Sequence, residues 1–532
     1  MGITNSDQYV YDLFVIGGGV NGTGIARDAA GRGLSVCLAE KTDLASATSS
    51  ASTKLFHGGL RYLEYFEFRL VREALVEREQ LLVAMPHISW PMRFVLPYSP
   101  KFRFENTTPT SRLVNLLMPW LKGRRPAWLI RLGLFLYDRL GGRKILPATR
   151  TIDLKSDVLG SSLRDEFELA YEYSDCWVED SRLVALNARD ASERGATILT
   201  RTEVVSMERV DGIWAIVIRN PNGELEWLRA RGVVNAAGQW VESIVRNALK
   251  TKLNVNAGVR LVKGSHVVVK KLYEHDRCYF FQGTDGRIMF AIPHEQDFTL
   301  LGTTDVDHPD PNIPATCSDE ERDYLLKFAS KYFKKVVSKE DVVWTYSGIR
   351  PLYDDGADSA TAATRDYVLK LDHHEKAAPI LNIFGGKITT YRKLAESALK
   401  ELKPFFKNMT TDWTAGVPLP GGNFQVDEFD NLVQRLHSEK PFLGQSFARR
   451  LVRAYGLDAF VMLADLNRQE DLGLDFGATL TECEVRWLIE HEFVTQADDV
   501  IWRRTKLGLK MTNDQIQNLE QWFDTTAFKT AS

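Results

Sequence analysis

The chain contains few cysteines, and none of them stands in a metal- or redox-type pair. Five cysteines occur among 532 residues, at positions 37, 176, 278, 317 and 483, without a C-x-x-C spacing. This pattern excludes an obvious zinc site and a dense disulfide framework. We therefore expect a reducing compartment and no metal centre.

The sequence also lacks a long apolar run, a leader and an excess of charge. No stretch approaches the roughly 18 uninterrupted apolar residues that span a bilayer, and MGITNSDQYV at the start has neither region of a signal peptide. A net charge of −3 gives no reason to expect nucleic acid as a partner. Length and a 44% apolar fraction instead predict two or three folded domains.

A βαβ unit with a glycine-rich turn opens the chain. An apolar run, Leu13 to Ile16, predicts a buried strand, and Gly17, Gly19 and Gly22 follow it as G-x-G-x-x-G. A second apolar run, Leu34 to Leu38, ends at Glu40. Glycines at this turn let the backbone approach a pyrophosphate at the helix N-terminus, and the glutamate can accept the ribose hydroxyls. The unit predicts a dinucleotide site.

The position of this unit and the residues after it favour FAD over NAD. Residues 42–63 are rich in small hydroxyl side chains, and Thr48, Ser49 and Ser50 lie among them. Such a segment can run extended along a long cofactor and donate hydrogen bonds to it. The alternative is a polar surface loop.

Two later strand–turn–helix segments support a flavin fold. Residues 232–240, GVVNAAGQW, form an apolar strand that breaks near Gly238. Residues 380–393, ILNIFGGKITTYRK, predict a strand, a turn and a helix. A helix N-terminus beside a lysine suits the negative charge that develops at flavin N1 and O2 on reduction. The cofactor candidates of the second segment are Gly385, Gly386, Lys387, Ile388 and Thr389.

Several motifs together resemble one family over nearly the whole chain. GGGVNGTGIARDAAGRGLSV, TSSASTKLFHGGLRYLE, KGSH, GTTDVD, YSGIRPL, TRDY and GGKITTYRKLAE occur in this order. They resemble the aerobic, FAD-dependent glycerol-3-phosphate dehydrogenases, as does ADDVIWRRTKLGL near the C-terminus. One departure is the segment from Pro100 to Arg125, which is longer than in the bacterial members.

The resemblance implies an α/β fold with an FAD-binding, Rossmann-like domain and a β-rich substrate cap, as in amino-acid oxidases. We expect the FAD-binding domain to be discontinuous, at about 1–90, 150–250 and 340–400. The cap would comprise about 91–149 and 251–339, where strand-like alternation occurs. After a Pro- and Gly-rich linker, amphipathic patterns predict a helical C-terminal domain over 401–532.

The resemblance also implies oxidation of sn-glycerol 3-phosphate to dihydroxyacetone phosphate, with electrons passed to membrane ubiquinone. Such an oxidation needs a flavin to take the hydride, a base for the hydroxyl proton, cations for the developing alkoxide and a phosphate anchor. The matched positions that line the family's substrate pocket are Arg61, Tyr62, His266, Arg350, Arg365 and Lys387.

Side-chain chemistry assigns an expected role to each of these residues. Arginine binds phosphate in a bidentate manner, so Arg61 and Arg365 are the phosphate candidates. Arg350 would orient the C2 hydroxyl and stabilise the alkoxide, beside Lys387. Arginine is a poor proton acceptor, whereas histidine has an ordinary pKa suited to a base near neutral pH. We therefore expect His266 to be the base or a proton relay, although a histidine before a strand is otherwise more often a core residue.

A basic segment suggests contact with a membrane surface. Between Arg93 and Lys144 there are eleven Lys or Arg and two acidic residues, a net of +9, and Trp120 and Trp128 lie among apolar neighbours. Cations, tryptophans and apolar residues together are typical of an interfacial segment. We expect a peripheral protein on the inner face of the cytoplasmic membrane, bound to anionic lipid. The alternative is a cap with a solvated basic face.

Other functions on the same scaffold remain open at this point. An oxidase would pass electrons to oxygen and make hydrogen peroxide. An amino-acid or amine oxidase is disfavoured because one arginine suffices for a carboxylate. A non-catalytic flavin-binding interaction protein would have no need of Arg350 and Lys387. The expectation allows for a homodimer.

Overall fold

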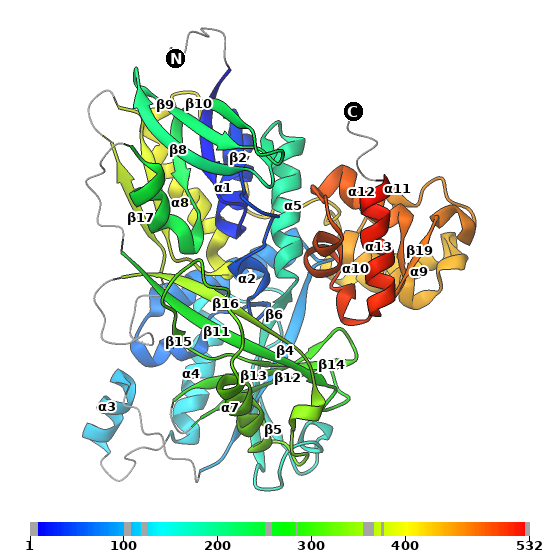
Figure 1. The fold of residues 1–532 in the computed structure, drawn as a ribbon. Helices are drawn as coiled ribbons and strands as arrows, with labels where there is room; N and C mark the ends of the chain where they lie inside the picture. The colour runs from blue at the N-terminus through cyan, green and yellow to red at the C-terminus, as the bar shows by residue number, and fades with distance from the viewer. Residues whose placement is uncertain are drawn as a thin grey trace.

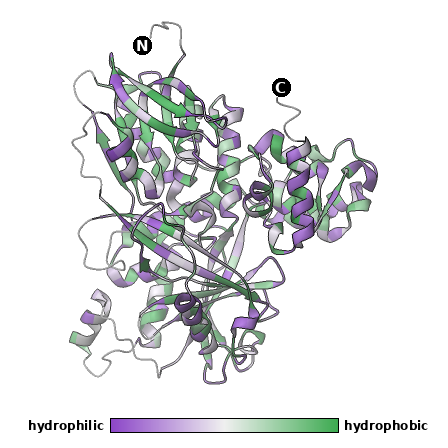
Figure 2. Cartoon of the chain, viewed as in Figure 1, coloured by the Kyte–Doolittle hydropathy of each residue, from purple (hydrophilic) through white to green (hydrophobic). Residues whose placement is uncertain are grey.

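The computed structural model describes residues 9–100, 108–118, 125–250, 258–283, 286–354, 366–373 and 377–526. In these residues, two large sheets lie one beyond the other, and a helical domain packs at one side (Figure 1). Strands in both sheets carry hydrophobic residues interleaved with hydrophilic ones (Figure 2).

The first sheet contains the βαβ unit that the sequence predicts. Strands β17, β18, β10, β1, β2 and β7 lie side by side in that order, and β9 pairs with β10 and β8. The pairings among β18, β10, β1, β2 and β7 are parallel. The strands are β1 (Val10–Ile16), β2 (Val36–Ala39), β7 (Thr197–Leu199), β8 (Glu203–Val210), β9 (Ile213–Arg219), β10 (Leu225–Asn235), β17 (Val368–Asp372) and β18 (Ile380–Phe384).

Helix α1 (Val20–Gly31) lies in the centre of this part of the molecule. It contacts α5 (Asp180–Glu193) and α8 (Tyr391–Leu402) as well as β1 and β2. Its small residues permit this close packing, because a Cβ on Gly24 would lie 2.8 Å from the Tyr391 ring. Central parallel strands must be covered on both faces, and Leu13–Ile16 are accordingly buried.

The second sheet has ten strands, in the order β15, β11, β14, β13, β12, β4, β6, β3, with β16 on β11 and β5 on β6. These are β3 (Leu55–Phe56), β4 (Ser89–Tyr98), β5 (Arg150–Asp153), β6 (Leu169–Val178), β11 (Val259–Lys270), β12 (Cys278–Gln282), β13 (Ile288–His294), β14 (Phe298–Gly302), β15 (Val306–Asp307) and β16 (Val342–Tyr353). Thus β6 and β16, which lie in ranges that the sequence assigns to the cofactor domain, pair with strands of the second sheet.

Helices cover both faces of the second sheet. Helix α7 (Asp319–Ser330) shares a core with Val267 and Val269, whereas Val268 packs into the core of α2 (Phe68–Ala84) and α4 (Ala127–Leu140). This alternation follows from the two-residue period of a strand. Helix α3 (Pro109–Leu117) lies at the edge of this region (Figure 1).

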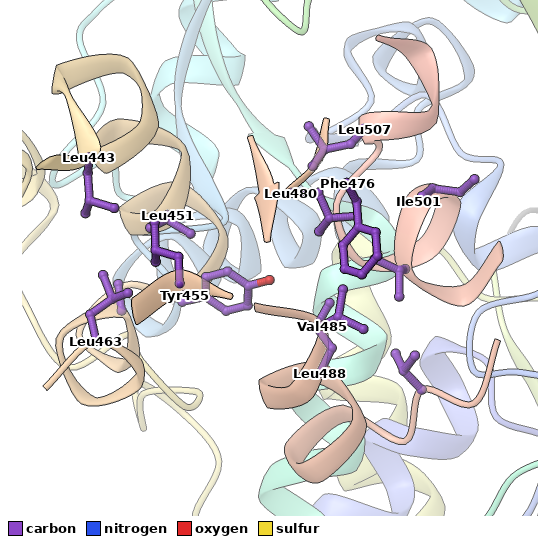
Figure 3. Close-up of a cluster of buried hydrophobic side chains, with 14 of the residues drawn as sticks. Leu443, Leu451, Tyr455, Leu463, Phe476, Leu480, Val485, Leu488, Ile501 and Leu507 are labelled. Atoms are coloured by element: carbon purple, nitrogen blue, oxygen red, sulfur yellow. The ribbon is translucent and has the colours of Figure 1, made fainter. Parts of the chain in front are cut away.

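The C-terminal helices have a core of their own, which Figure 3 shows around Leu451, Tyr455 and Leu488. This region contains α9 (Phe429–Glu439), α10 (Gln445–Tyr455), α11 (Asp458–Met462), β19 (Asp475–Gly477), β20 (Leu480–Thr481), α12 (Glu482–Glu492), a π-helix η13 (Asp499–Arg504) and α13 (Asn513–Thr526). The domain boundaries themselves stay a prediction.

Among the residues that the structure describes, no helix is both long and apolar enough to cross a membrane.

Candidate functional site

The turn between β1 and α1 has the geometry that its glycines predict. Gly17 has φ +104°, in the left-handed region that favours glycine. A Cβ on Gly22 would lie 1.9 Å from the Gly17 carbonyl oxygen, so no side chain fits there. The start of α1 therefore packs directly against the end of β1, and Gly17 and Gly19 at this turn line a cavity.

Glu40 lies at the end of β2 and faces this turn. Its Oε2 accepts a hydrogen bond from the Gly18 N–H at 2.7 Å, and its Oε1 accepts from the Thr42 N–H at 2.9 Å. Thr42 Oγ1 also donates to Oε1, at 3.0 Å. A carboxylate has about four acceptor sites, so Oε2 can still accept a ribose hydroxyl.

The sequence led us to expect an extended hydroxyl-rich segment, but this segment is not extended throughout. Thr48–Ser50 form a short 3-10 helix, η1, because local backbone bonds such as Ala51 N–H to the Thr48 carbonyl close it. Ser49 Oγ accepts from the Val20 N–H at 3.0 Å at the start of α1. Thr48 Oγ1 donates to the Ile349 carbonyl at 2.6 Å and links the segment to β16.

A cavity of about 380 Å³ joins these elements. Its walls include Gly17, Gly19 and Glu40, the turn Ala47–Ser49, and Gly238, which opens the short helix η5 (Gly238–Trp240). α6 (Val241–Ser243) continues this wall to Ser243. The backbone donors, the carboxylate and the missing side chains at the turn fit the adenosine diphosphate half of FAD.

The turn after β18 also has a backbone conformation that favours glycine. Gly385 and Gly386 have φ of +70° and +99°, and Ile388–Thr390 form a 3-10 helix before α8. Thr389 Oγ1 accepts from the His57 N–H at 3.2 Å. The Lys387 ammonium lies over the Tyr62 ring, 3.9 Å from its centre. The turn is thus joined to the segment that carries Arg61 and Tyr62.

Asn21 is a site residue that the sequence analysis missed. Its Nδ2 donates to the Gly385 carbonyl at 3.1 Å, so it connects α1 to the Gly385–Gly386 turn. Its Oδ1 is buried without a hydrogen-bond partner within the described residues. A buried orphan acceptor is rare and indicates an absent ligand or water. The signal in the sequence was a polar residue inside the glycine motif.

Arg350 lies on β16 and is held by the loop after β14. It forms an ion pair with Asp305, and its Nη2 donates to Thr303 Oγ1 at 3.0 Å. A Cβ on Gly264 would lie 2.4 Å from Nη2, so glycine makes room for the guanidinium. Thr303 and Asp305 belong to the motif GTTDVD, from which no role could be assigned to them.

His266 is close to Arg350 but is unsuited to be the base that the sequence predicts. Its ring stacks on Tyr346 at 4.7 Å, and Nε2 lies 2.9 Å from Thr53 Oγ1. Burial first, and then the nearby Arg350 and Lys54 charges, lowers the pKa of His266 to about 3. A group with this pKa is neutral at pH 7 and accepts a proton poorly. His266 is therefore better described as a residue that positions Thr53 and Tyr346.

Of the remaining two candidates, Arg61 and Arg365, the structure describes only Arg61. The Arg61 guanidinium lies 6.0 Å from the centre of the Tyr65 ring. Arg365 lies outside the described residues, as do the residues just before it. A Cβ on Gly385 would lie 3.8 Å from the Pro351 carbonyl, so the Gly385 turn and the end of β16 are adjacent. The structure thus brings Tyr62, Lys387 and the strand of Arg350 together.

Within the described part of the chain, no three His, Cys, Asp or Glu side chains are grouped as metal ligands.

Two family models match most of this chain. A family model described as "FAD dependent oxidoreductase" matches residues 12–392, and one described as "C-terminal domain of alpha-glycerophosphate oxidase" matches residues 413–528. A solved glycerol-3-phosphate dehydrogenase from Bacillus halodurans, complexed with FAD, is similar in fold, with a TM-score of 0.70 at 24% identity over 98% of this chain and 94% of that one.

Similar curated proteins fall into two substrate classes. D-erythritol 1-phosphate dehydrogenase of Brucella abortus is 49% identical over 96% of this chain and 97% of its own length. Glycerol-3-phosphate dehydrogenase of Pseudomonas aeruginosa is 47% identical over 96% of this chain and 95% of its own. Aerobic glycerol-3-phosphate dehydrogenase of Escherichia coli is 45% identical over 96% and 97%.

Glu40→Gln should weaken FAD retention. The change removes a charge-assisted hydrogen bond, worth about 1.5–3 kcal/mol, or roughly a ten- to hundredfold change in affinity. FAD content after dialysis is the measurement. Glu224→Gln, on an exposed turn, is the matched control and should keep its FAD. Equal retention by both variants would remove Glu40 from the cofactor site.

His266→Asn should leave the pH dependence of flavin reduction between pH 6 and 8 unchanged, because a group with a pKa of about 3 does not titrate there. Rapid-mixing kinetics across this range is the measurement.

The unfolded state, with the ordinary pKa of 6.5, binds the proton first. His266 therefore destabilises the fold progressively as pH falls from about 6.5 towards 3, and the variant should lose this part of the acid destabilisation. A wild-type titration near pH 7 that disappears in the variant would restore His266 as the base.

Proposed function

We propose that this chain, which belongs to the family of FAD-dependent glycerol-3-phosphate dehydrogenases, oxidises sn-glycerol 3-phosphate to dihydroxyacetone phosphate. The observation that carries the proposal is the meeting of Lys387 and Tyr62 with the strand of Arg350 beside the Gly385–Gly386 turn. FAD, when bound, accepts the hydride from C2 of the substrate.

Arg350 would hold the C2 oxygen. Its bonds to Asp305 and Thr303 fix the plane of its guanidinium. Fixed cations stabilise an alkoxide more than mobile water does, because they need no reorganisation as charge develops. Lys387, beside the Tyr62 ring, would add positive charge on the flavin side.

The phosphate dianion would be anchored by Arg61, on the segment that also supplies Tyr62, and by Arg365. Burial raises the pKa of Glu64, while Arg125 and Arg61 act to lower it, so the Arg61 charge is felt at this segment. Arg69 pairs with Asp366, next to Arg365 in the chain. Asp366 itself lies beside the Gly385 turn, because a Cβ on Gly385 would come within 3.0 Å of its carbonyl oxygen.

A second candidate substrate is a four-carbon polyol phosphate. The specific observation is the 49% identity to D-erythritol 1-phosphate dehydrogenase over almost the full chain. The reaction would be the same, with one more carbon to accommodate. Glycerol 3-phosphate remains the first candidate, because three other relatives at 45–47% identity act on it by name.

The electron acceptor that we propose is membrane ubiquinone. The alternative acceptor is oxygen, as in an oxidase that makes hydrogen peroxide. A non-catalytic flavin protein is disfavoured by the ion pair and hydrogen bonds that hold Arg350 in place.

When glycerol 3-phosphate is mixed anaerobically with the FAD-loaded protein, the visible absorbance of the bound flavin should be bleached. A short-chain quinone should restore it much faster than air, because the proposal assigns electrons to a quinone. D-erythritol 1-phosphate and plain glycerol serve as comparisons in the same measurement. Faster bleaching by the erythritol ester would make it the substrate, fast recolouring by air would indicate an oxidase, and no bleaching by either ester would contradict the enzyme proposal.

An exposed apolar patch supports contact with a membrane. Helix α4 carries Trp128, Leu132 and Phe135 on one face, and each is about half exposed. Leu116 and Leu117 at the end of α3 are 77% and 65% exposed. Arg131 and Arg139 of α4 are also exposed. Residues 101–107 and 119–124 of the basic segment, Trp120 among them, lie outside the described residues.

This combination fits peripheral binding at the inner face of the cytoplasmic membrane, where ubiquinone is available. Exposed tryptophan and aliphatic side chains bury in the headgroup region, and each cation near an anionic surface contributes about 1 kcal/mol. A homodimer stays a prediction.

Trp128→Ser, Leu132→Ser and Phe135→Ser, combined, should reduce co-sedimentation with anionic vesicles several-fold while leaving dye reduction by glycerol 3-phosphate intact. Arg131→Gln with Arg139→Gln should weaken binding mainly at low salt, because salt screens the charges. The matched control changes Val461 and Leu474, exposed apolar residues of the C-terminal region, to Ser. If the control loses as much binding as the patch variant, α4 is only a solvated face.

A further inference from the structure

Residues 40–46, here called the ribose turn, connect the end of β2 to the hydroxyl-rich segment. Thr42 Oγ1 donates to Glu40 Oε1 at 3.0 Å and lies 2.5 Å from Ser46 Oγ. The Ala45 N–H donates to the Gly18 carbonyl at 3.1 Å, in the glycine motif. The direction in which Glu40 points therefore depends on the shape of this turn.

The ribose turn contains a buried carboxylate that the C-terminal domain neutralises. Asp43 is 2% exposed, and its Oδ1 and Oδ2 accept from Arg504 at 2.9 and 3.0 Å. Arg503 Nε donates to Asp43 Oδ2 at 2.5 Å. Both arginines belong to η13, about 460 residues away in the chain. Arg504 is itself fully buried in the interface.

A second contact fixes the same turn from the residues between β7 and β8. The Arg201 N–H donates to the Thr42 carbonyl at 2.7 Å, and the Thr202 N–H donates to the Glu40 carbonyl at 2.8 Å. The Arg201 side chain in turn pairs with Asp499 of η13 at 2.9 Å. Asp499 also accepts from Arg503 at 2.5 Å, so the two contacts form one network.

Stability alone does not account for this network of buried charges. Burying a carboxylate is unfavourable without a partner, and buried ion pairs often add little to stability compared with apolar packing. What a bidentate arginine pair supplies is geometry, because its planar fork fixes the carboxylate in one orientation. Here the fixed carboxylate lies three residues from Glu40, whose orientation decides ribose binding.

We propose that Asp43, Arg503 and Arg504 are positioning residues for the cofactor, through which the C-terminal domain holds the ribose turn and thereby Glu40 in its FAD-binding orientation. The C-terminal domain is then a part of the cofactor site, although none of its described residues lines the cavity at Glu40. The proposal rests on the FAD site and is independent of the substrate.

Asp43→Asn should weaken FAD binding about tenfold or more, because it breaks charge-assisted bonds while keeping the side chain's shape. FAD release from diluted holoenzyme, followed by the rise in flavin fluorescence, is the measurement. Arg503→Gln, whose side chain is partly exposed, is a milder second variant and should act in the same direction. Thermal unfolding at saturating FAD measures the structural effect separately.

The matched control is Arg189→Gln. Arg189 of α5 pairs with Asp458 of α11 at 2.7 Å, so it also joins the two domains, but it does not bond to the ribose turn. It should lower the unfolding temperature without changing FAD affinity by more than about twofold. Equal loss of FAD affinity in Arg189→Gln and Arg503→Gln would show a general docking effect and overturn the proposal.

A double-mutant cycle tests whether the effect passes through Glu40. If Asp43 acts by orienting Glu40, Asp43→Asn should change FAD affinity little once Glu40 is already Gln. Fully additive effects in the cycle, or wild-type FAD affinity in both Asp43→Asn and Arg503→Gln, would overturn the inference. Wild-type protein that binds no FAD would overturn the cofactor site itself. Protein that binds FAD but is not bleached by either phosphate ester would contradict only the substrate proposal.

Discussion

The close passage of Gly22 over Gly17 is the constraint on which the rest of this molecule depends. A Cβ on Gly22 would come within 1.9 Å of the Gly17 carbonyl oxygen, so the start of α1 lies directly on the end of β1. That contact places the helix N-terminus, the Gly18 amide and the Glu40 carboxylate around one point. It also sets where α1 meets α5 and α8, because a Cβ on Gly24 would already meet the Tyr391 ring of α8. A side chain at these glycines would therefore displace the cofactor turn and the helices behind it together.

Buried ion pairs then fix how the parts of the chain meet. Lys54, within the hydroxyl-rich segment, pairs with Asp180 at the start of α5, and Arg392 of α8 pairs with Glu77 of α2. Burial tends to raise the pKa of Asp180, yet the Lys54 and Lys506 charges outweigh it and hold the pKa below the ordinary value. Such pairs add modest net stability, but removing one partner leaves an uncompensated buried charge, at a cost of about 3–5 kcal/mol. They therefore disfavour wrong dockings more than they strengthen the right one, and they hold the segment of Lys54 against α5 and α2 against α8.

Local sequence patterns were sufficient for features that local chemistry decides. The Gly17–Gly22 turn, its flanking strands and the Gly385–Gly386 turn follow from backbone conformations that only glycine adopts readily. Features set by distant contacts were beyond those patterns. The membership of β6 and β16 in the second sheet depends on pairing with β4 and β11. The 3-10 turn at Thr48–Ser50 is closed by local backbone bonds, which the hydroxyl-rich composition did not indicate. The roles of Asn21 and Asp305 emerge only when chain segments hundreds or tens of residues apart are brought together. Arg365, which the motif singles out, lies outside the described residues.

The environment of His266 shows why residue type alone is a weak guide to the catalytic base. A histidine titrates near neutrality only where water or a carboxylate can stabilise its charged form. Here the ring is buried against Tyr346, and two cations lie near it. Burial is the first cause of the low pKa of His266, and the Arg350 and Lys54 charges add to it. The cation of Arg350 would also stabilise a nearby alkoxide or phosphate. A hydroxyl that is acidified in this way would need a weaker base to accept its proton, so a neutral histidine is compatible with a site in which fixed cations ease deprotonation.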